Sequence, residues 1–211
     1  MLTIPPETIS AFIDTCHAAG RRGLVQCSSG NLSCRLDETR MLATASGSWL
    51  EDIRDDQLSI CRIDDATLIE GPPPTVEAAF HAGILKHRPD VNVVFHFQTP
   101  YATLLACGDP AAIDYFVIPE IPVYMGAIGH VPYLRPGSPA LAAAVVEAGK
   151  KHDMIILASH GMVTVGKNDR HVIQNAVFFE FACRLIVEGR DTINPLSAEA
   201  IEQLTSTSGK A

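Results

Sequence analysis

Positive charge is scarce in this chain of 211 residues. It has 16 lysines and arginines against 24 aspartates and glutamates, which gives a formal net charge of −8. A protein that binds nucleic acid or an anionic membrane surface needs a basic face. We therefore expect neither partner. A small anionic substrate stays open, because backbone N–H groups can bind one.

Long apolar runs and closely spaced cysteines are also missing. No uncharged apolar stretch approaches the roughly 18 residues that a membrane span needs. The N-terminus lacks the basic and then apolar segments of a signal peptide. The six cysteines form no C-x-x-C pair, and Cys107 and Cys183 lie among apolar neighbours. This pattern predicts buried, free thiols in a cytoplasmic protein, with disulfides as the alternative.

The composition that remains is that of a globular domain. Hydrophobic residues make up 47% and charged residues 19% of the chain, and 211 residues can bury one sizeable core. We find no internal repeat and no linker, so we expect a single domain over residues 1–211. Residues 108–136 are rich in proline and glycine and give no clear assignment.

Hydrophobic periodicity predicts an α+β domain. Apolar positions at helical spacing predict helices over residues 7–21, 76–87, 100 onward, 138 onward and 168–189. Alternating or continuous apolar runs predict strands over residues 32–36, 41–44, 58–63, 67–69, 91–96, 154–158 and 161–165. Thr75 and Ser138 are suitable N-caps. Early hairpins followed by interspersed helices indicate a largely antiparallel sheet with helices on its faces.

Two histidines each end an apolar strand. His96 follows residues 93–95, and His160 follows residues 157–159. A histidine at a strand end lies on the rim of a sheet, where its imidazole can face a cleft. A single histidine in this position is more often a hydrogen-bonded core residue. Two of them in one domain are the minimum for a metal site.

Several short motifs occur in an order that resembles the class II aldolase/adducin family. The motifs are Ser29-Gly30-Asn31-Leu32-Ser33, Thr44-Ala45-Ser46-Gly47, Pro74-Thr75-Val76-Glu77 with His81, the His96 segment through Ala102, and Ser159-His160-Gly161. The resemblance covers about residues 23–188. It implies an α/β/α three-layer domain, assembled as a homotetramer with the active site between neighbouring subunits. It also implies a divalent metal, typically zinc, on three histidines.

The implied metal ligands are His96, the residue at position 98 and His160. Position 98 is Gln98, which departs from the family pattern. An amide oxygen is a weaker ligand than imidazole, so the set would lose zinc affinity or shift toward Mn²⁺, Co²⁺ or Mg²⁺. The alternative is that the metal has been lost and Gln98 hydrogen-bonds His96.

Glu77 corresponds to the family's proton-transfer residue, which would take up or return the proton next to the substrate carbonyl. The alternative is a solvated glutamate that complements the dipole of the helix it begins. His81, one turn later, is expected to be a structural or exposed histidine.

Small and hydroxyl residues suggest a cradle for the substrate's anionic group. They are Gly30, Asn31, Ser46, Gly47 and Thr75. Small residues let backbone N–H groups approach an anion, and hydroxyls add donors. Family members that bind sugar phosphates commonly have a second hydroxyl residue where this chain has Val76. The substrate can therefore carry a phosphate or a carboxylate.

The family's aldolases use a tyrosine of the neighbouring subunit to protonate the leaving alkoxide. Tyr124 is the nearest match, with Tyr115 and Tyr133 as alternatives. The leading hypothesis is a metal-dependent aldehyde-lyase that cleaves a small sugar phosphate or a related hydroxy-keto acid through an enediolate. The alternatives are a 4-epimerase, a decarboxylase or a dehydratase of a phosphorylated sugar acid, or a non-catalytic adducin-like binding domain.

Overall fold

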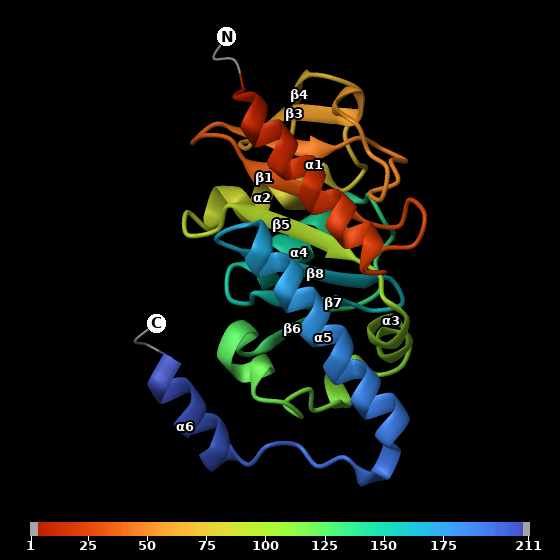
Figure 1. Ribbon diagram of the computed structural model, residues 1–211, viewed down its shortest axis with the longest axis vertical. Helices are drawn as coiled ribbons and strands as arrows, with labels where there is room; N and C mark the ends of the chain where they lie inside the picture. Colours follow the sequence, from red (N-terminus) through yellow and green to blue (C-terminus); the bar gives the residue numbers. More distant parts are fainter. Residues whose placement is uncertain (1–3, 209–211) are drawn as a thin grey trace.

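A sheet of eight strands forms the centre of the computed structural model, which describes residues 4–208 (Figure 1). The strands are β1 (Asn31–Arg35), β2 (Arg40–Thr44), β3 (Leu58–Arg62), β4 (Leu68–Glu70), β5 (Val93–Phe97), β6 (Ile128–Val131), β7 (Met154–Leu157) and β8 (Gly161–Gly166). The α-helices are α1 (Pro6–Arg21), α2 (Ala78–His87), α3 (Pro100–Ala106), α4 (Pro139–Gly149), α5 (Asp169–Gly189) and α6 (Ala198–Ser208).

The strand order in the sheet is β4-β3-β2-β1-β5-β8-β7-β6. Within the described residues, β6 and β7 pair in parallel, and the other neighbouring strands pair antiparallel. Strand β5 lies between β1 and β8, with His96 opposite Asn31 on one side and opposite Val163 on the other. This register places the start of β1, the end of β5 and the start of β8 side by side, although these segments are far apart in sequence.

Helices cover both faces of the sheet and divide the core into two clusters. On one face, α1, α3 and α5 bury residues such as Phe12, Ala102 and Phe179 against the strands. On the other face, α2 and α4 bury Phe80 and Leu141. Figure 1 shows α1 and α5 crossing the near face, with α2 and α4 behind the sheet. The single α/β/α domain with a mostly antiparallel sheet is therefore confirmed.

The second predicted helix begins later than expected. Thr75 is not its N-cap, because the helix begins at Ala78 and Glu77 occupies the capping position. The Thr75 N–H donates to the Thr44 carbonyl, next to a bridge between Ala45 and Pro74. This pairing keeps the chain extended up to Thr75. The predicted cap at Ser138 is confirmed, since its Oγ accepts from the N–H of Leu141.

The cysteines are free thiols, as predicted, but not all of them are buried. All six cysteines are free thiols, and Cys183 is buried. Cys27 and Cys107 are exposed, contrary to the prediction, because they lie just outside regular elements, Cys27 before β1 and Cys107 directly after α3. Residues 108–136 contain a π-helical segment and β6, and the sequence pattern did not predict α6. No helix in residues 4–208 is long and apolar enough to cross a membrane.

Candidate active site

A cavity of about 290 Å³ opens where the ends of β1, β5 and β8 meet the start of α2. Its lining includes nearly every site residue expected from the sequence: Gly30, Asn31, Ser46, Gly47, Thr75, Glu77, His96, Gln98 and His160. Tyr124 is the exception. The fold therefore gathers the candidate metal ligands, the proposed proton-transfer residue and the candidate anion cradle around one space.

Glu77 lies between the two strand-end histidines. Its Oε2 is 3.6 Å from His96 Nε2, and its Oε1 is 3.5 Å from His160 Nε2. Glu77 is 5% exposed and His96 1%, and the three ligand-type atoms lie within 4.8 Å of one another. The prediction of a histidine pair at one rim is confirmed in its geometry. The alternative of a solvated Glu77 is wrong, because Asn31, His96 and His160 surround its carboxylate.

The protonation of the histidines suits metal binding. His96 Nδ1 lies 2.9 Å from the Met162 carbonyl, so it donates there and leaves the Nε2 lone pair facing Glu77. Burial lowers the pKa of His160 to about 4; nearby His96 adds to this effect and Glu77 opposes it. His160 is therefore neutral at pH 7 and has a lone pair to offer.

The cluster fits a divalent ion. Zinc ligands lie about 2.1 Å from the ion, so two ligand atoms of a tetrahedral site are about 3.5 Å apart. The two distances from Glu77 to the histidines match this spacing. Glu77 Oε1 is buried and has no hydrogen-bond partner within residues 4–208. A buried carboxylate oxygen without a donor is costly unless a cation or a proton satisfies it.

Gln98 faces the same space. Its Nε2 lies 3.5 Å from His96 Nε2, at the limit of a hydrogen bond. The amide can be rotated so that Oε1 takes this position, and the site then has two imidazoles, a carboxylate and a carboxamide as donors. Gly161 permits the close approach, because a Cβ there would lie 2.7 Å from Gln98 Cγ and 3.0 Å from His96 Cε1.

Asn31 contacts the carboxylate of Glu77, and His81 contacts Asn31. Asn31 Nδ2 donates to Glu77 Oε2 at 2.9 Å, and Asn31 Oδ1 lies 2.6 Å from His81 Nε2. His81 is completely buried. Of the two expected alternatives, a structural histidine and an exposed one, the structure supports the first. Both polar atoms of the Asn31 side chain therefore form hydrogen bonds within the protein, to Glu77 and His81, and the side chain is not available to bind the substrate's anionic group.

The other cradle residues are small or carry a free hydroxyl hydrogen. A Cβ at Gly30 would lie 2.1 Å from Val25 Cγ1, and Gly47 has φ +76°, so each position requires glycine. Thr75 Oγ1 accepts from the N–H of Glu77 at 3.3 Å, which leaves its hydrogen free to donate to a ligand. Ser28, Ser48 and Pro136 also line the cavity. Ser28 and Ser48 adjoin predicted motifs, whereas nothing in the sequence pattern marks Pro136.

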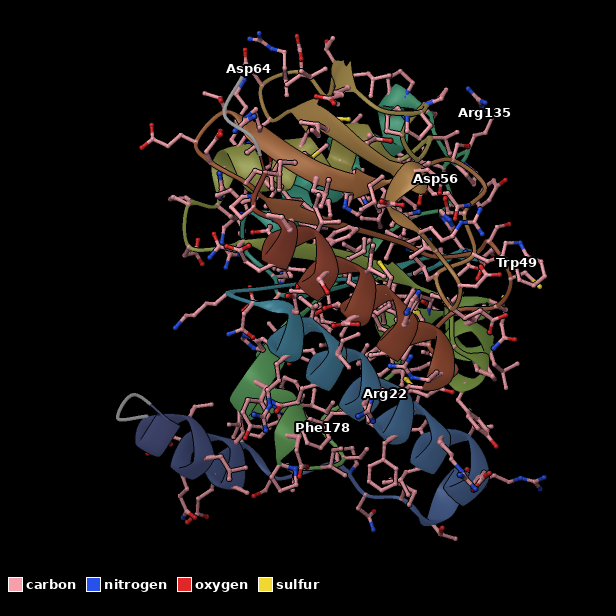
Figure 2. The ribbon with its side chains drawn as sticks, turned by 45° about the horizontal axis from the view of Figure 1, so that its top comes forward. Arg22, Trp49, Asp56, Asp64, Arg135 and Phe178 are labelled. Atoms are coloured by element: carbon pink, nitrogen blue, oxygen red, sulfur yellow. The ribbon has the colours of Figure 1, made fainter. Side chains whose placement is uncertain are left out.

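The tyrosines lie outside this cavity in a single protomer. Tyr124 belongs to the π-helical segment Ile121–Met125, is 42% exposed and stacks on Phe178 of α5 with ring centroids 5.8 Å apart. Phe178 is labelled in Figure 2. Tyr115 is buried beside His130 at a separate cavity, and Tyr133 is 62% exposed.

Comparisons with known proteins agree with this architecture. The family model described as "Class II Aldolase and Adducin N-terminal domain" matches residues 10–187. The 3-oxo-tetronate 4-phosphate decarboxylase of Haemophilus influenzae is 31% identical over 192 residues, which cover 90% of this chain and 88% of that protein. The L-fuculose phosphate aldolase of Methanococcus vannielii is 33% identical over 158 residues, covering 75% and 83%.

Solved structures show the same fold. The crystal structure of YgbL from Klebsiella pneumoniae superposes with a TM-score of 0.86 at 27% identity, covering 94% of this chain and 98% of that one. An L-fuculose 1-phosphate aldolase superposes with a TM-score of 0.83 at 20% identity, covering 96% of both chains. The second likeness supports the fold alone.

Proposed function

Because the chain belongs to the class II aldolase and adducin family, we propose that it is a metal-dependent lyase that breaks a carbon–carbon bond in a small phosphorylated sugar acid or ketose. The observation that carries the proposal is the buried Glu77 carboxylate between His96 and His160, on the wall of a polar cavity. A non-catalytic adducin-like domain has no need of this cluster, so we favour an enzyme.

We place decarboxylation of a 3-oxo sugar acid phosphate first among the reactions. Four curated relatives with this activity in their names match 88% or more of the chain. Carbon dioxide leaves as a neutral molecule, so decarboxylation needs no acid to protonate a leaving alkoxide.

The ion would be held by His96, Gln98 and His160, and the Glu77 carboxylate would add an oxygen donor at the spacing of a tetrahedral site. A bound divalent ion supplies a Lewis acid that binds adjacent substrate oxygens and takes up developing negative charge. Zinc is the family's typical ion, and the amide of Gln98 adds Mn²⁺, Co²⁺ and Mg²⁺ as candidates.

Glu77 would act as the proton carrier. When the bond between C1 and C2 of a 3-oxo acid breaks, its electron pair moves toward the C3 carbonyl and carbon dioxide departs. The resulting enediolate needs one proton at C2, which the protonated Glu77 delivers and later regains from water. Oε1 suits this role because it is buried at the cavity and lacks a hydrogen-bond partner within residues 4–208. Removal of a positioned acid–base group slows a reaction by about 10²–10⁴-fold.

The anion cradle would hold the phosphate. Gly30 and Gly47 let the backbone come close to it, and the hydroxyls of Ser46 and Thr75 add donors. The exposed Val76 beside them supplies no hydroxyl. The cradle would fix the phosphate end of the substrate so that C2 and C3 lie in the cavity beside Glu77 and the histidines.

Aldol cleavage of a ketose phosphate is the second candidate, supported by the match to L-fuculose phosphate aldolases. It needs an acid for the leaving alkoxide. We propose Tyr124 of a neighbouring subunit for this role, since its ring is 42% exposed and open to a second copy. Tyr115 and Tyr133 are the alternatives, and tyrosine-to-phenylalanine variants at the three positions separate them.

The deciding experiment supplies metal-loaded protein with 3-oxo-tetronate 4-phosphate and with L-fuculose 1-phosphate, and measures carbon dioxide and aldehyde release. We expect carbon dioxide from the first substrate, with a kcat about 10²–10⁴-fold lower in Glu77→Gln. The matched control is Glu147→Gln, which changes an exposed carboxylate. Aldehyde release alone would support the aldolase instead. No release from either substrate by metal-loaded protein would contradict the lyase proposal.

A further inference from the structure

Behind the active-site cavity, four buried side chains form a continuous hydrogen-bonded chain. Ser33 Oγ lies 2.7 Å from His81 Nδ1, His81 Nε2 lies 2.6 Å from Asn31 Oδ1, and Asn31 Nδ2 lies 2.9 Å from Glu77 Oε2. Ser33 and His81 are fully buried, and Asn31 and Glu77 are 8% and 5% exposed. Two members come from β1, and two come from the start of α2 and its first turn.

The direction of every hydrogen bond in this chain follows from Glu77. A carboxylate can only accept, so Asn31 must turn its amide hydrogens toward Glu77 and its oxygen toward His81. That oxygen needs a donor, so the proton of His81 must be on Nε2. Nδ1 of His81 then carries the lone pair and accepts from the hydroxyl of Ser33. The chain therefore has one consistent arrangement with an ionised Glu77.

We propose that His81 is a positioning residue for Glu77, which acts by locking the orientation of the Asn31 amide. Without an Nε2–H donor, Asn31 Oδ1 has no hydrogen-bond partner, and only the bond from Nδ2 to Glu77 Oε2 still orients the amide. The Asn31 side chain can then turn toward another donor for Oδ1, which weakens its hydrogen bond to Glu77. The proposal rests on the assigned role of Glu77 as the proton carrier.

The geometry at Glu77 shows what this positioning achieves. The chain occupies Oε2 and leaves Oε1 without a hydrogen-bond partner within residues 4–208, 3.5 Å from His160 Nε2 at the cavity. One carboxylate oxygen is thus fixed and the other is kept for the substrate. Burial also lowers the pKa of His81 to about 3, with a smaller effect of His96, so the ring stays neutral and keeps one lone pair for Ser33.

The test compares His81→Phe, His81→Gln and Ser33→Ala with wild type. Phenylalanine removes both ring nitrogens, whereas the glutamine amide can restore an N–H near the position of Nε2. The control is His87→Phe on the same helix, where the ring is exposed and its Nδ1 contacts the Gly83 carbonyl. We measure kcat and KM for 3-oxo-tetronate 4-phosphate. We also record nitrogen-15 NMR spectra of the histidine rings and the Asn31 side-chain amide.

We expect kcat to fall about 10–100-fold in His81→Phe, as for loss of a group that orients an active-site residue, while KM changes less than about threefold. His81→Gln should recover most of the loss. In wild type, the His81 signals should report a proton on Nε2, and the Asn31 amide signals should shift in His81→Phe and return in His81→Gln.

A proton on Nδ1 of His81, or Asn31 amide signals that are the same in wild type and His81→Phe, would overturn the proposal. An unchanged kcat in folded His81→Phe would also overturn it. If His81→Phe does not fold, Ser33→Ala decides by the same signals: the His81 proton should stay on Nε2, because Asn31 Oδ1 still needs a donor, and a move of the proton to Nδ1 would overturn the proposal. If wild type turns over no substrate, the lyase assignment fails, and the NMR signals still decide the positioning role.

Discussion

Individual side chains at this site have environments that their sequence neighbours do not determine. Glu77 follows a proline-rich segment at the start of a helix, where a glutamate is usually solvated, yet it is buried and accepts from Asn31, 46 residues earlier. Resemblance to a family pointed to Glu77, His96 and His160, and the fold brings them together. It did not reveal that the Asn31 side chain contacts Glu77 and His81, since that contact depends on how β1 lies beside α2.

His81 should make the stability of the metal-free protein depend on pH. Its pKa is about 3 in the fold, lowered by burial, against an ordinary value of 6.5. The unfolded chain therefore binds a proton first as the pH falls. Its contribution to stability is complete above about pH 6.5 and is lost progressively below it, by about 1.4 kcal/mol per pH unit.

Denaturant unfolding of wild type and His81→Gln between pH 7.5 and 4.5 measures this contribution. We expect the free energy of unfolding to fall more steeply in wild type. The lowered pKa of His160 adds the same slope to both proteins, so it cancels in the comparison. Equal slopes for the two proteins would show that His81 is not held neutral by the fold.

At the scale of elements, the turn between β7 and β8 sets the position of His160. Ser159 has φ +53°, in the left-handed region that non-glycine residues rarely adopt. Its N–H donates to the Ala106 carbonyl at the end of α3, which holds this conformation. Gly161 follows His160 and packs directly against the end of β5.

Gly161→Ala should damage both stability and metal binding. The new Cβ would lie 2.8 Å from the Phe97 carbonyl oxygen and 3.0 Å from His96 Cε1, so β5 and β8 must separate. We expect a loss of about 1–3 kcal/mol in the free energy of unfolding and metal affinity about 10–100-fold lower.

Gly108→Ala is the matched control. A Cβ there meets only the Leu105 carbonyl oxygen at 3.5 Å, an ordinary contact. Denaturant unfolding and a competitive metal titration measure both variants. Equal unfolding free energies and equal metal affinities of the two variants would show that close packing of Gly161 against β5 does not set the position of His160.

The elements themselves were largely predictable from the sequence. Both hairpins and α1, α4 and α5 have apolar spacing that marks one buried face. The start of α2 was misplaced because the pairing of Thr75 with Thr44 links residues 31 positions apart. Helix α6 packs against the π-helical segment, and its only large apolar residues are Ile201 and Leu204, so no long apolar pattern marks it in the sequence.

At the scale of the whole molecule, the order of the strands makes the site. Strands β1, β5 and β8 are neighbours, although β1 precedes β8 by more than a hundred residues. Periodicity predicts each strand and says nothing about which strands are adjacent. The resemblance to a family gave the fold class, which the structure confirms, and only the structure shows the order of the strands.

We expect a homotetramer in solution, because the resemblance to the family implies this assembly with an active site between neighbouring subunits. Large apolar side chains are exposed near the cavity and on the rest of the surface, among them Trp49 (46%), Val76 (66%) and Tyr133 (62%). Figure 2 shows Trp49 projecting from the side of the molecule that also carries Asp56 and Arg135. Light scattering after size exclusion should give about four times the 22.7 kDa of one chain. A stable monomer would contradict a site completed by a neighbour.

We expect His96, Gln98 and His160, together with Glu77, to bind a divalent ion. The direct measurement is metal content by plasma mass spectrometry on protein purified without chelators or added metal. Wild type, His160→Ala and Gln98→His are measured together. We expect close to one divalent ion per chain in wild type and Gln98→His, and little in His160→Ala. An empty wild type beside a filled Gln98→His would show that Gln98 has disabled the site.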